Sequence, residues 1–165
     1  MYGTHIAPSD APADLLDLDD ALLRLRRLWT APPPALVLEQ GDGEPVTLSS
    51  VLVVEACARG EGEVGVGEVG RFLDVEHSTA SRLVDRAVRA GLVERTPSAV
   101  DARRVALRLT PSGQGLRERA VGFRLGWLGQ VLADWDAGEV RALARSLTRF
   151  AEAVVTAGPP GSTAG

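Results

Sequence analysis

Short hydroxyl side chains and arginines are concentrated in one stretch of the sequence, residues 77–89. With a helical period of 3.6 residues they fall on or beside one face, and the opposite face carries apolar residues. Hydroxyl groups are small donors that allow a helix backbone to approach a surface closely. The planar guanidinium group makes paired hydrogen bonds to guanine or phosphate. These residue types predict non-covalent recognition of DNA in the major groove, through His77, Ser78, Thr79, Ser81, Arg82 and Arg86.

The elements around this stretch predict a winged helix-turn-helix. A short helix over residues 68–73 and a longer one over 77–90 are separated by a tight turn, and Gly91 is placed to end the second helix. Two runs with strand character follow, residues 92–96 and 105–110, joined by a loop that carries Arg103 and Arg104. A solvated helix face with ordinary charges is the alternative for residues 77–90 taken alone. The wing that follows directly weakens that alternative.

Longer helices are predicted on both sides of this segment. Apolar residues at three- and four-residue spacing predict helices over 14–29 and 137–156, the second capped by Asp136. Thr47 or Ser49 begins a helix that runs through Arg59, and Thr110 followed by proline begins another that runs to about residue 132. Val64 and Val66 alternate as in a short strand. The last predicted strand alternates in the same way, with one face made of Val105, Leu107 and Leu109.

The expected fold class is mainly α with a small β-wing (α+β). The winged helix-turn-helix occupies residues 47–110. Residues 13–30 and 111–156 form a helical dimerisation region, since their apolar faces are wider than one small neighbour would cover. Residues 1–12 and 158–165 are predicted to be disordered tails.

The composition places the chain among globular proteins. It has 165 residues, of which 45% are apolar and 24% charged, and this fits one compact domain. No uncharged apolar run reaches the roughly 18 residues of a membrane span, and residues 1–12 lack the pattern of a secretory signal. Cys57 is the single cysteine, so no intrachain disulfide is expected, and we expect a cytoplasmic protein. The histidines and the cysteine lack metal-ligand spacing, and neither a metal nor a cofactor is expected.

Charge is distributed unevenly along the chain. The net charge is −4, yet residues 71–108 hold 8 arginines against 5 acidic residues, a net of +3. A basic segment in an acidic protein is typical of contact with an anionic partner. All basic residues are arginines, which a coding bias toward GC-rich codons explains, but such a bias does not explain their clustering.

Three segments resemble the MarR family of transcriptional regulators, within about residues 47–119. Residues 77–95, HSTASRLVDRAVRAGLVER, are similar to the family's recognition helix and first wing strand. Residues 101–104, DARR, match its wing signature, and residues 109–113, LTPSG, match the start of its fifth helix. The resemblance implies a homodimer with intertwined terminal helices that binds a palindromic operator in double-stranded DNA. It also implies repression in most cases, and often release by a small aromatic or phenolic effector.

The resemblance assigns a role to Asp101. In the family this aspartate pairs with a wing arginine and fixes the wing tip, so that Arg103 is held toward the minor groove. An ordinary exposed turn aspartate is the alternative. Before the recognition helix the family usually has Gly-Val-Ser/Thr, whereas this chain has Asp74, Val75 and Glu76, and glutamate is a poor N-cap.

The sequence does not identify an effector site. The linker over residues 31–46 is longer than in the family, so effector-binding residues cannot be transferred. Trp29 is the candidate for effector contact; it, Trp127 and Trp135 either line a pocket or fill the dimer core.

Two other classes of function are weighed: a protein-interaction module, which remains an alternative, and an enzyme, which is not expected. A winged helix that serves as a protein-interaction module without DNA binding is the alternative, favoured by the net charge and by Glu76. An enzyme is not expected, because no nucleophile–base pair or P-loop is present and the glycines at 65, 67 and 70 lack βαβ context.

Cys57 is interpreted as a core residue rather than a redox sensor, because no Lys, His or second Cys lies near it in the sequence.

Overall fold

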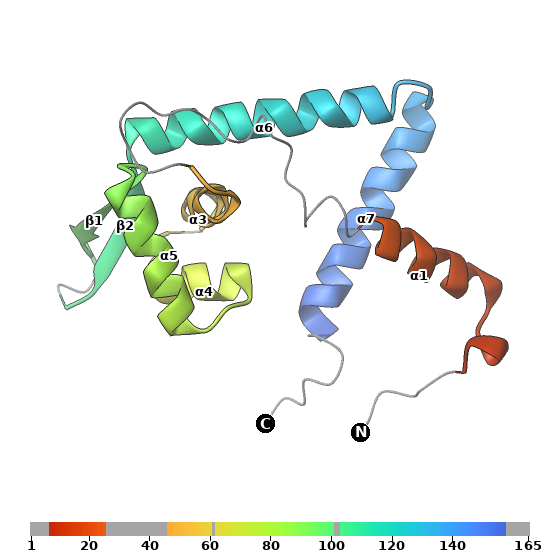
Figure 1. The fold of residues 1–165 in the computed structure, drawn as a ribbon, viewed down its shortest axis with the longest axis horizontal. Coiled ribbons are helices and arrows are strands. Elements are labelled where there is room, and N and C mark those ends of the chain that lie inside the picture. Colours follow the sequence, from red (N-terminus) through yellow and green to blue (C-terminus); the bar gives the residue numbers. More distant parts are fainter. Residues whose placement is uncertain (1–6, 26–45, 61, 101–102, 158–165) are drawn as a thin grey trace. The chain divides into compact units, whose positions relative to one another are not determined.

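The computed structural model describes residues 7–25, 46–60, 62–100 and 103–157 (Figure 1). These residues are mainly helical, with one two-stranded antiparallel sheet, which confirms the predicted fold class. Internal contacts divide the chain into two units, residues 31–126 and residues 1–30 together with 127–165. The long helix α6 (Pro111–Val131) contributes to both units. The dimerisation role of residues 111–156 stays a prediction.

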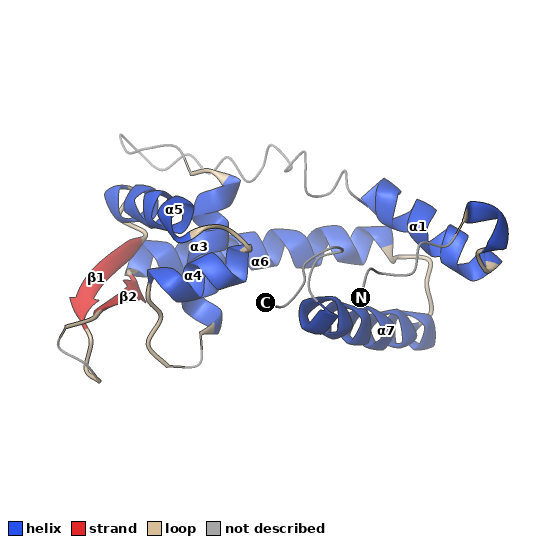
Figure 2. Ribbon diagram, turned by 90° about the horizontal axis from the view of Figure 1, so that it is seen from below, coloured by secondary structure: helices blue, strands red, loops and turns tan. Residues whose placement is uncertain are grey.

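The unit of residues 31–126 contains the winged helix-turn-helix (Figure 2). Thr47 begins its first helix, because the Thr47 hydroxyl accepts a hydrogen bond from the Ser50 N–H at 3.3 Å. Gly91 follows the recognition helix with a φ of +66°, a left-handed conformation that glycine adopts without strain. Both assignments agree with the sequence prediction. The elements of this unit are α3 (Leu48–Arg59), α4 (Val66–Leu73), α5 (His77–Arg89), β1 (Val93–Pro97), β2 (Val105–Leu109) and the first part of α6.

The strand predicted around Val64 and Val66 is wrong for Val66. Val66 is the first residue of α4, because the Glu68 carboxylate accepts a hydrogen bond from the Gly65 N–H at 2.9 Å and starts the helix there. Val64 does pair with the sheet: its carbonyl accepts a hydrogen bond from the Leu107 N–H at 2.7 Å. The loop before α4 is therefore attached to the edge of the hairpin.

The strict alternation predicted for β2 is also wrong. Ala106 and Leu107 are both 4% exposed, whereas Val105 is 54% exposed. Successive strand side chains point to opposite faces, so the middle of β2 is covered on both faces. Val105 lies at the loop end of the hairpin, opposite Pro97.

The core of this unit consists mainly of small branched side chains. Val53, Val54, Val69 and Val84 are fully buried, and burial of each contributes about 1.5–3 kcal/mol. Leu116 of α6 belongs to the same cluster. The first turns of α6 are therefore part of the body that supports α5.

Hydrogen bonds of Thr110 join the start of α6 to the end of α5. The Thr110 hydroxyl donates a hydrogen bond to the Gly91 carbonyl at 2.6 Å and accepts one from the Gly113 N–H at 3.1 Å. The Thr110 N–H donates to the Leu92 carbonyl at 3.1 Å. At this crossing Gly113 lies so close to the neighbouring backbone that a Cβ atom on it would be 2.0 Å from the Leu92 oxygen.

A buried carboxylate joins α3 to α6. Glu55 is 4% exposed and accepts hydrogen bonds from Arg124 at 2.6 Å and from Arg59 at 3.2 Å, and Arg117 Nε lies 3.6 Å from it. Burial raises the pKa of Glu55, but the hydrogen bonds from Arg124 and Arg59 and the charges of Arg124 and Arg117 outweigh burial and leave that pKa lowered. The charged form of Glu55 is therefore favoured in the folded protein.

We expect Glu55→Gln to destabilise the protein at neutral pH by about 1–3 kcal/mol, because it removes the charge that three arginines share. The folded-state pKa lies below the unfolded-state value of about 4.3, so the contribution is complete above that pH. It is lost as the pH falls through the folded-state pKa. Urea unfolding at pH 7 and pH 4 should show the difference between wild type and variant shrinking at the lower pH. Glu118→Gln, at an exposed position of α6, is the matched control.

The other unit contains α1 (Ala13–Leu25), the end of α6 and α7 (Ala137–Ala157). Asp136 caps α7 as predicted: its carboxylate accepts a hydrogen bond from the Glu139 N–H at 3.0 Å, and the Glu139 carboxylate accepts one from the Asp136 N–H at 2.8 Å. Neither α1 nor α7 contains a buried residue over these ranges. Large apolar side chains are instead exposed along both helices, namely Leu15, Leu16, Leu18, Leu22, Leu23, Leu25, Leu147, Phe150, Val154 and Val155.

The ends of the helices differ slightly from the sequence prediction. Residues 26–29 of the predicted first helix and the predicted tail 158–165 lie outside the described residues. A short 3-10 helix, η1 (Pro8–Asp10), lies within the segment predicted to be disordered. Among the helices that the structure describes, none has the length and apolar character needed to cross a membrane.

Candidate nucleic-acid interface

The recognition helix α5 has two sharply different faces. Ala80, Val84 and Ala87 are fully buried against the body of the unit. Leu83 and Val88, also predicted for the buried stripe, are half-buried at its margins. The predicted DNA-contacting residues occupy the remaining surface, where Thr79 and Ser81 are half-buried and the exposed ones are His77, Ser78, Arg82 and Arg86.

Arg82 is held loosely on this surface. Its guanidinium donates a hydrogen bond to the Thr79 hydroxyl, one turn earlier, at a long distance of 3.4 Å. A bond of that length between exposed groups orients the side chain along the helix but is readily exchanged for a better acceptor. The Arg82 guanidinium is thus exposed and only weakly held by its neighbour.

The turn before α5 is built by residues that the MarR resemblance does not predict. Asp74 has a φ of +52°, a left-handed conformation that short polar residues tolerate. Glu76 occupies the N-cap position and its side chain makes no capping hydrogen bond, as expected for glutamate. Gly70 of α4 allows close approach, because a Cβ atom there would lie 3.2 Å from the Val75 oxygen.

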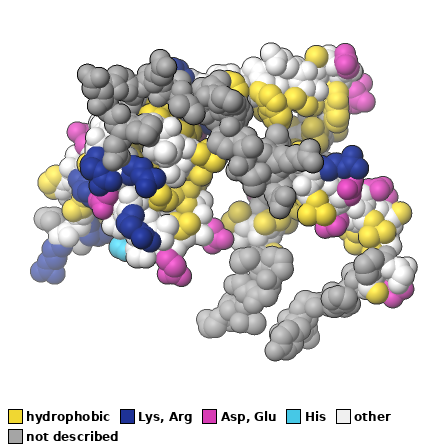
Figure 3. Space-filling model, in the orientation of Figure 1, with side chains coloured by type: hydrophobic (Ala, Val, Ile, Leu, Met, Phe, Trp, Pro, Cys, Tyr) yellow, Lys and Arg dark blue, Asp and Glu magenta, His cyan; other side chains and the backbone are white. Residues whose placement is uncertain are grey.

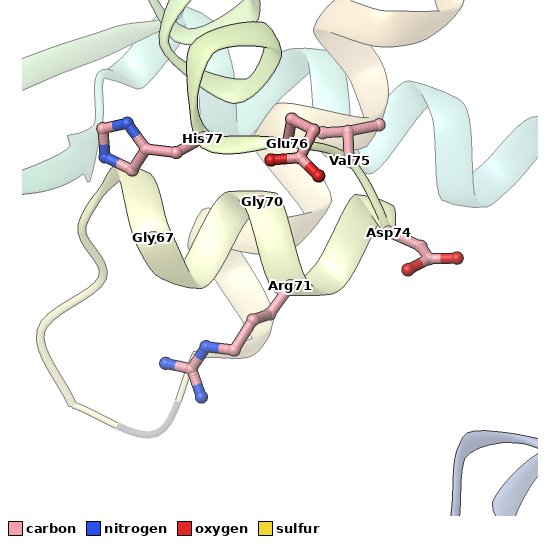
Figure 4. A pocket seen from close by; sticks show the side chains of 7 residues that line it. All are labelled: Gly67, Gly70, Arg71, Asp74, Val75, Glu76 and His77. Carbon is pink, nitrogen blue, oxygen red and sulfur yellow. The ribbon is translucent and has the colours of Figure 1, made fainter. Parts of the chain in front are cut away.

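A surface hollow of about 430 Å³ lies at this turn and is lined by seven residues, shown in Figure 4: Gly67, Gly70, Arg71, Asp74, Val75, Glu76 and His77. The side chains of Arg71, Asp74 and His77 point in different directions in that view. They do not converge on a common ligand. Within the part of the chain that is described, no group of three His, Cys, Asp or Glu side chains could hold a metal ion.

The wing carries its arginines on an ordered base. Arg103 and Arg104 are exposed, and the Arg104 carbonyl accepts a hydrogen bond from the Ser98 N–H at 3.0 Å, just beyond the last strand pair. The Arg104 guanidinium lies 3.8 Å from the Glu68 carboxylate of α4. Asp101, predicted to fix the wing tip, lies outside the described residues.

The sequence interpretation missed two contacts that hold the wing to the helices. Arg95 of β1 donates a hydrogen bond to Asp85 of α5 at 2.6 Å, an exposed pair whose contribution is at most about 1 kcal/mol. Glu63, in the loop between α3 and α4, accepts hydrogen bonds from Ser98 and from the Ala99 N–H. Neither partner is visible from local patterns, because each pair is separated by ten or more residues in the chain.

Arginine side chains gather over α5 and the wing on the face drawn in Figure 3. This agrees with the basic segment at residues 71–108 in the sequence. Parts of this charge are already neutralised within the unit: Glu68 pairs with Arg71 at 2.9 Å, and Asp85 pairs with Arg95. Arg82 and Arg86 are exposed on the open face of α5.

Two further predictions concern residues away from this surface. Trp29, the candidate for effector contact, lies outside the described residues. Cys57 packs against the core of its unit, and burial raises the pKa of its thiol to about 11. The reactive thiolate is therefore scarce at neutral pH, which agrees with the interpretation of Cys57 as a core residue.

Known proteins share this architecture. The sequence model of the MarR family matches residues 45–104. A crystal structure of a MarR family transcription regulator gives a TM-score of 0.68 at 24% identity, covering 87% of this chain and 93% of that one. A MarR family protein from Bacillus stearothermophilus gives 0.60 at 26% identity, covering 86% and 91%. FabT from Streptococcus pneumoniae, solved in complex with DNA, gives 0.59 at 16% identity, covering 88% and 95%. Comparison with curated protein sequences gives no match.

The fold is that of winged helix-turn-helix proteins, a class that includes DNA-binding transcription regulators. Residues 45–104 match the sequence model of the MarR family, and the chain has the fold of solved MarR family proteins. The members of that family are transcription regulators.

Proposed function

We propose that this protein is a dimeric repressor that binds a palindromic DNA operator and is released by a small aromatic or phenolic effector. The division of α5 carries the DNA-binding part of this proposal. Three fully buried residues fix one face to the body of the unit, while hydroxyl groups and two arginines occupy the other. A helix held in this way can enter the major groove without changing its own packing.

The residues of the surface divide into two roles. Those of α5, namely His77, Ser78, Thr79, Ser81, Arg82 and Arg86, meet base edges and the adjacent phosphates. Arg103 and Arg104 of the wing meet the minor groove, where width and negative potential matter more than base identity. Asp101 would stabilise the wing tip that carries Arg103 and Arg104.

The exposed apolar faces of α1 and α7 support the homodimer. Monomeric proteins seldom leave so many large apolar side chains in water along two helices. A second copy of the same surface would cover them with two-fold symmetry. Such a pair presents two recognition helices to half-sites about 34 Å apart, one turn of DNA.

The effector part of the proposal is supported by a structural relative. The structure of BpsR from Bordetella bronchiseptica, with a TM-score of 0.57 at 19% identity, is titled as a mechanism for regulation of its DNA binding by 6-hydroxynicotinic acid. A thermal-shift screen of small aromatic acids and phenols would identify a binder here. Addition of that binder to the operator complex should then release the DNA, and binding without release would contradict the proposal.

We expect Arg82→Ala and Arg103→Ala to weaken DNA binding in different ways. Loss of Arg82 should cost about 1–3 kcal/mol on the operator and relax the preference at one position in each half-site. Loss of Arg103 should weaken operator and scrambled duplex by similar factors and reduce the salt slope by about one contact per subunit. Titrations of both duplexes over a range of salt concentrations, starting from the promoter of the protein's own gene, measure both effects.

Arg119→Ala is the matched control, because Arg119 is exposed on α6 outside α5 and the wing. It should change neither specificity nor the salt slope. Equal losses for the Arg82 and Arg103 variants on both duplexes would contradict the division into a reading helix and a positioning wing. Unchanged affinity in both variants would mean that this surface does not bind DNA.

A protein-interaction module without DNA binding is the second candidate. Asp74 and Glu76 favour it, since both are exposed next to the start of α5, where phosphates are expected. A mobility-shift experiment with the promoter duplex distinguishes the two, because the module would give no shift at any protein concentration at low salt.

A further inference from the structure

The carboxylate of Glu63 binds the chain at the point where the wing leaves the sheet. One oxygen accepts a hydrogen bond from the Ser98 hydroxyl, and the other accepts one from the Ala99 N–H at 2.5 Å. The Ser98 hydroxyl in turn accepts a hydrogen bond from the Val100 N–H at 3.1 Å. Three successive residues of the wing loop are therefore ordered, directly or through Ser98, by one side chain 35 residues earlier in the sequence.

Glu63 is itself fixed by its neighbour in the chain. The carbonyl of Val64 accepts a hydrogen bond from Leu107 of β2 at 2.7 Å, and Val64 is buried. This attachment of Val64 to the sheet places the preceding residue, Glu63, beside the base of the wing. The wing is thus connected to the helix-turn-helix body by a contact outside its own hairpin.

The strands alone would leave this region weakly held. The last strand pair joins Pro97 to Val105, and proline has no N–H to donate to the ladder. Beyond it the Ser98 N–H reaches the Arg104 carbonyl at 3.0 Å, and then the loop begins. The Glu63 carboxylate supplies an acceptor for the Ala99 N–H, and the Ser98 hydroxyl that donates to Glu63 supplies one for the Val100 N–H.

The carboxylate is well suited to this task because it stays ionised. The Ser98 hydrogen bond, followed by that of the Ala99 N–H, lowers the pKa of Glu63, and the charge of Arg108 acts in the same direction. Hydrogen bonds to an ionised acceptor are about twice as strong as those between neutral groups.

We propose that Glu63 is a positioning residue for the wing: through Ser98 and Ala99 it fixes the wing base and thereby presents Arg103 and Arg104 in one orientation. The contribution to DNA binding rests on the proposed function. A wing without this contact would have to become ordered when it binds DNA. Binding would then be less favourable by the free energy that this ordering costs.

The first experiment does not involve DNA. Trypsin cleaves after arginine, so the initial rate of cleavage at Arg103 and Arg104 in the native protein, followed by mass spectrometry, reports how well the wing is ordered. We expect Glu63→Ala to raise this rate about 10-fold. Glu63→Gln, which keeps one carbonyl acceptor, and Ser98→Ala should have intermediate rates. Glu94→Gln, which removes an exposed glutamate of β1, should match wild type.

Unchanged cleavage at the wing in Glu63→Ala would overturn the proposal. So would an equal rise at arginines throughout the chain, because that would mean global unfolding. Circular dichroism melts of each variant, and the intermediate behaviour of Glu63→Gln, separate a local effect from loss of the fold.

The second experiment measures the link to DNA. In the Glu63→Ala protein, the further change Arg103→Ala should cost less affinity than it does in wild type, while Arg82→Ala should cost the same in both. If the cost of Arg103→Ala is unchanged, Glu63 does not position the wing for binding, even where trypsin shows a looser wing. If no variant and no wild type binds DNA, the proposed function fails, and the cleavage rates still decide whether Glu63 orders the wing.

Discussion

Gly113→Ala should destabilise the winged-helix unit by at least about 2 kcal/mol, at the upper end of the cost of overpacking. The reason is backbone crowding at the start of α6. A Cβ atom on Gly113 would lie 2.0 Å from the Leu92 oxygen and 3.0 Å from its carbonyl carbon. Leu92 is fully buried, and its carbonyl already accepts a hydrogen bond from Thr110. Neither side can move without opening the core, so the urea midpoint should fall sharply.

Gly122→Ala provides a control of opposite sign in the same helix. No atom lies within 4 Å of the position of its Cβ, and alanine is favoured over glycine in a helix by about 0.5–1 kcal/mol. The urea midpoint should therefore rise for Gly122→Ala and fall for Gly113→Ala. Equal small changes at the two positions would show that α6 does not pass as close to Leu92 as described.

Phe150→Glu should convert the proposed dimer to a monomer and weaken operator binding at least 100-fold. Phe150 is 38% exposed in a single chain and lies on the apolar stripe of α7 with Leu147 and Val154. A charge at this position would have to be buried without a partner in the dimer, which costs several kcal/mol. A monomer contacts only one half-site, so the second set of contacts is lost as well. Light scattering at micromolar concentration and operator titration measure the two effects.

Arg149→Glu is the matched control, since it introduces the same side chain on the side of α7 away from the apolar stripe. It should leave the mass at that of a dimer. A dimeric Phe150→Glu protein would exclude this stripe as the interface. If light scattering gave the mass of a monomer for the wild-type protein, the proposed two-fold dimer would be wrong.

The sequence was most informative where structure is decided locally. The 3.6-residue period placed α5 within one residue of its observed end, and Thr47, Gly91 and Asp136 marked helix termini through the short-range hydrogen bonds and backbone conformations that such residues favour. A local signal was also missed. Glu68 stands three residues after Gly65 and its carboxylate accepts the Gly65 N–H at the start of α4, but the alternation of Val64 and Val66 hid this contact.

The contacts that the sequence could not reveal join distant residues. Nothing near Glu55 in the chain indicates that Arg117 and Arg124 will surround it, and nothing near Ser98 points to Glu63. The resemblance to the family drew attention to Asp101, within the wing itself. The described part of the wing shows a further support, from Glu63 in the loop between α3 and α4. Pairings of this kind depend on tertiary packing, which a periodic pattern does not encode.

The double role of the Thr110 hydroxyl has a mechanical consequence. One oxygen atom joins the carbonyl of Gly91, directly after the recognition helix, to the N–H of Gly113 in the first turn of α6. A rotation of that first turn must therefore carry the end of α5 with it or break a hydrogen bond. The two helices are coupled at this point, and a force applied to the start of α6 is transmitted to the end of α5 through two hydrogen bonds.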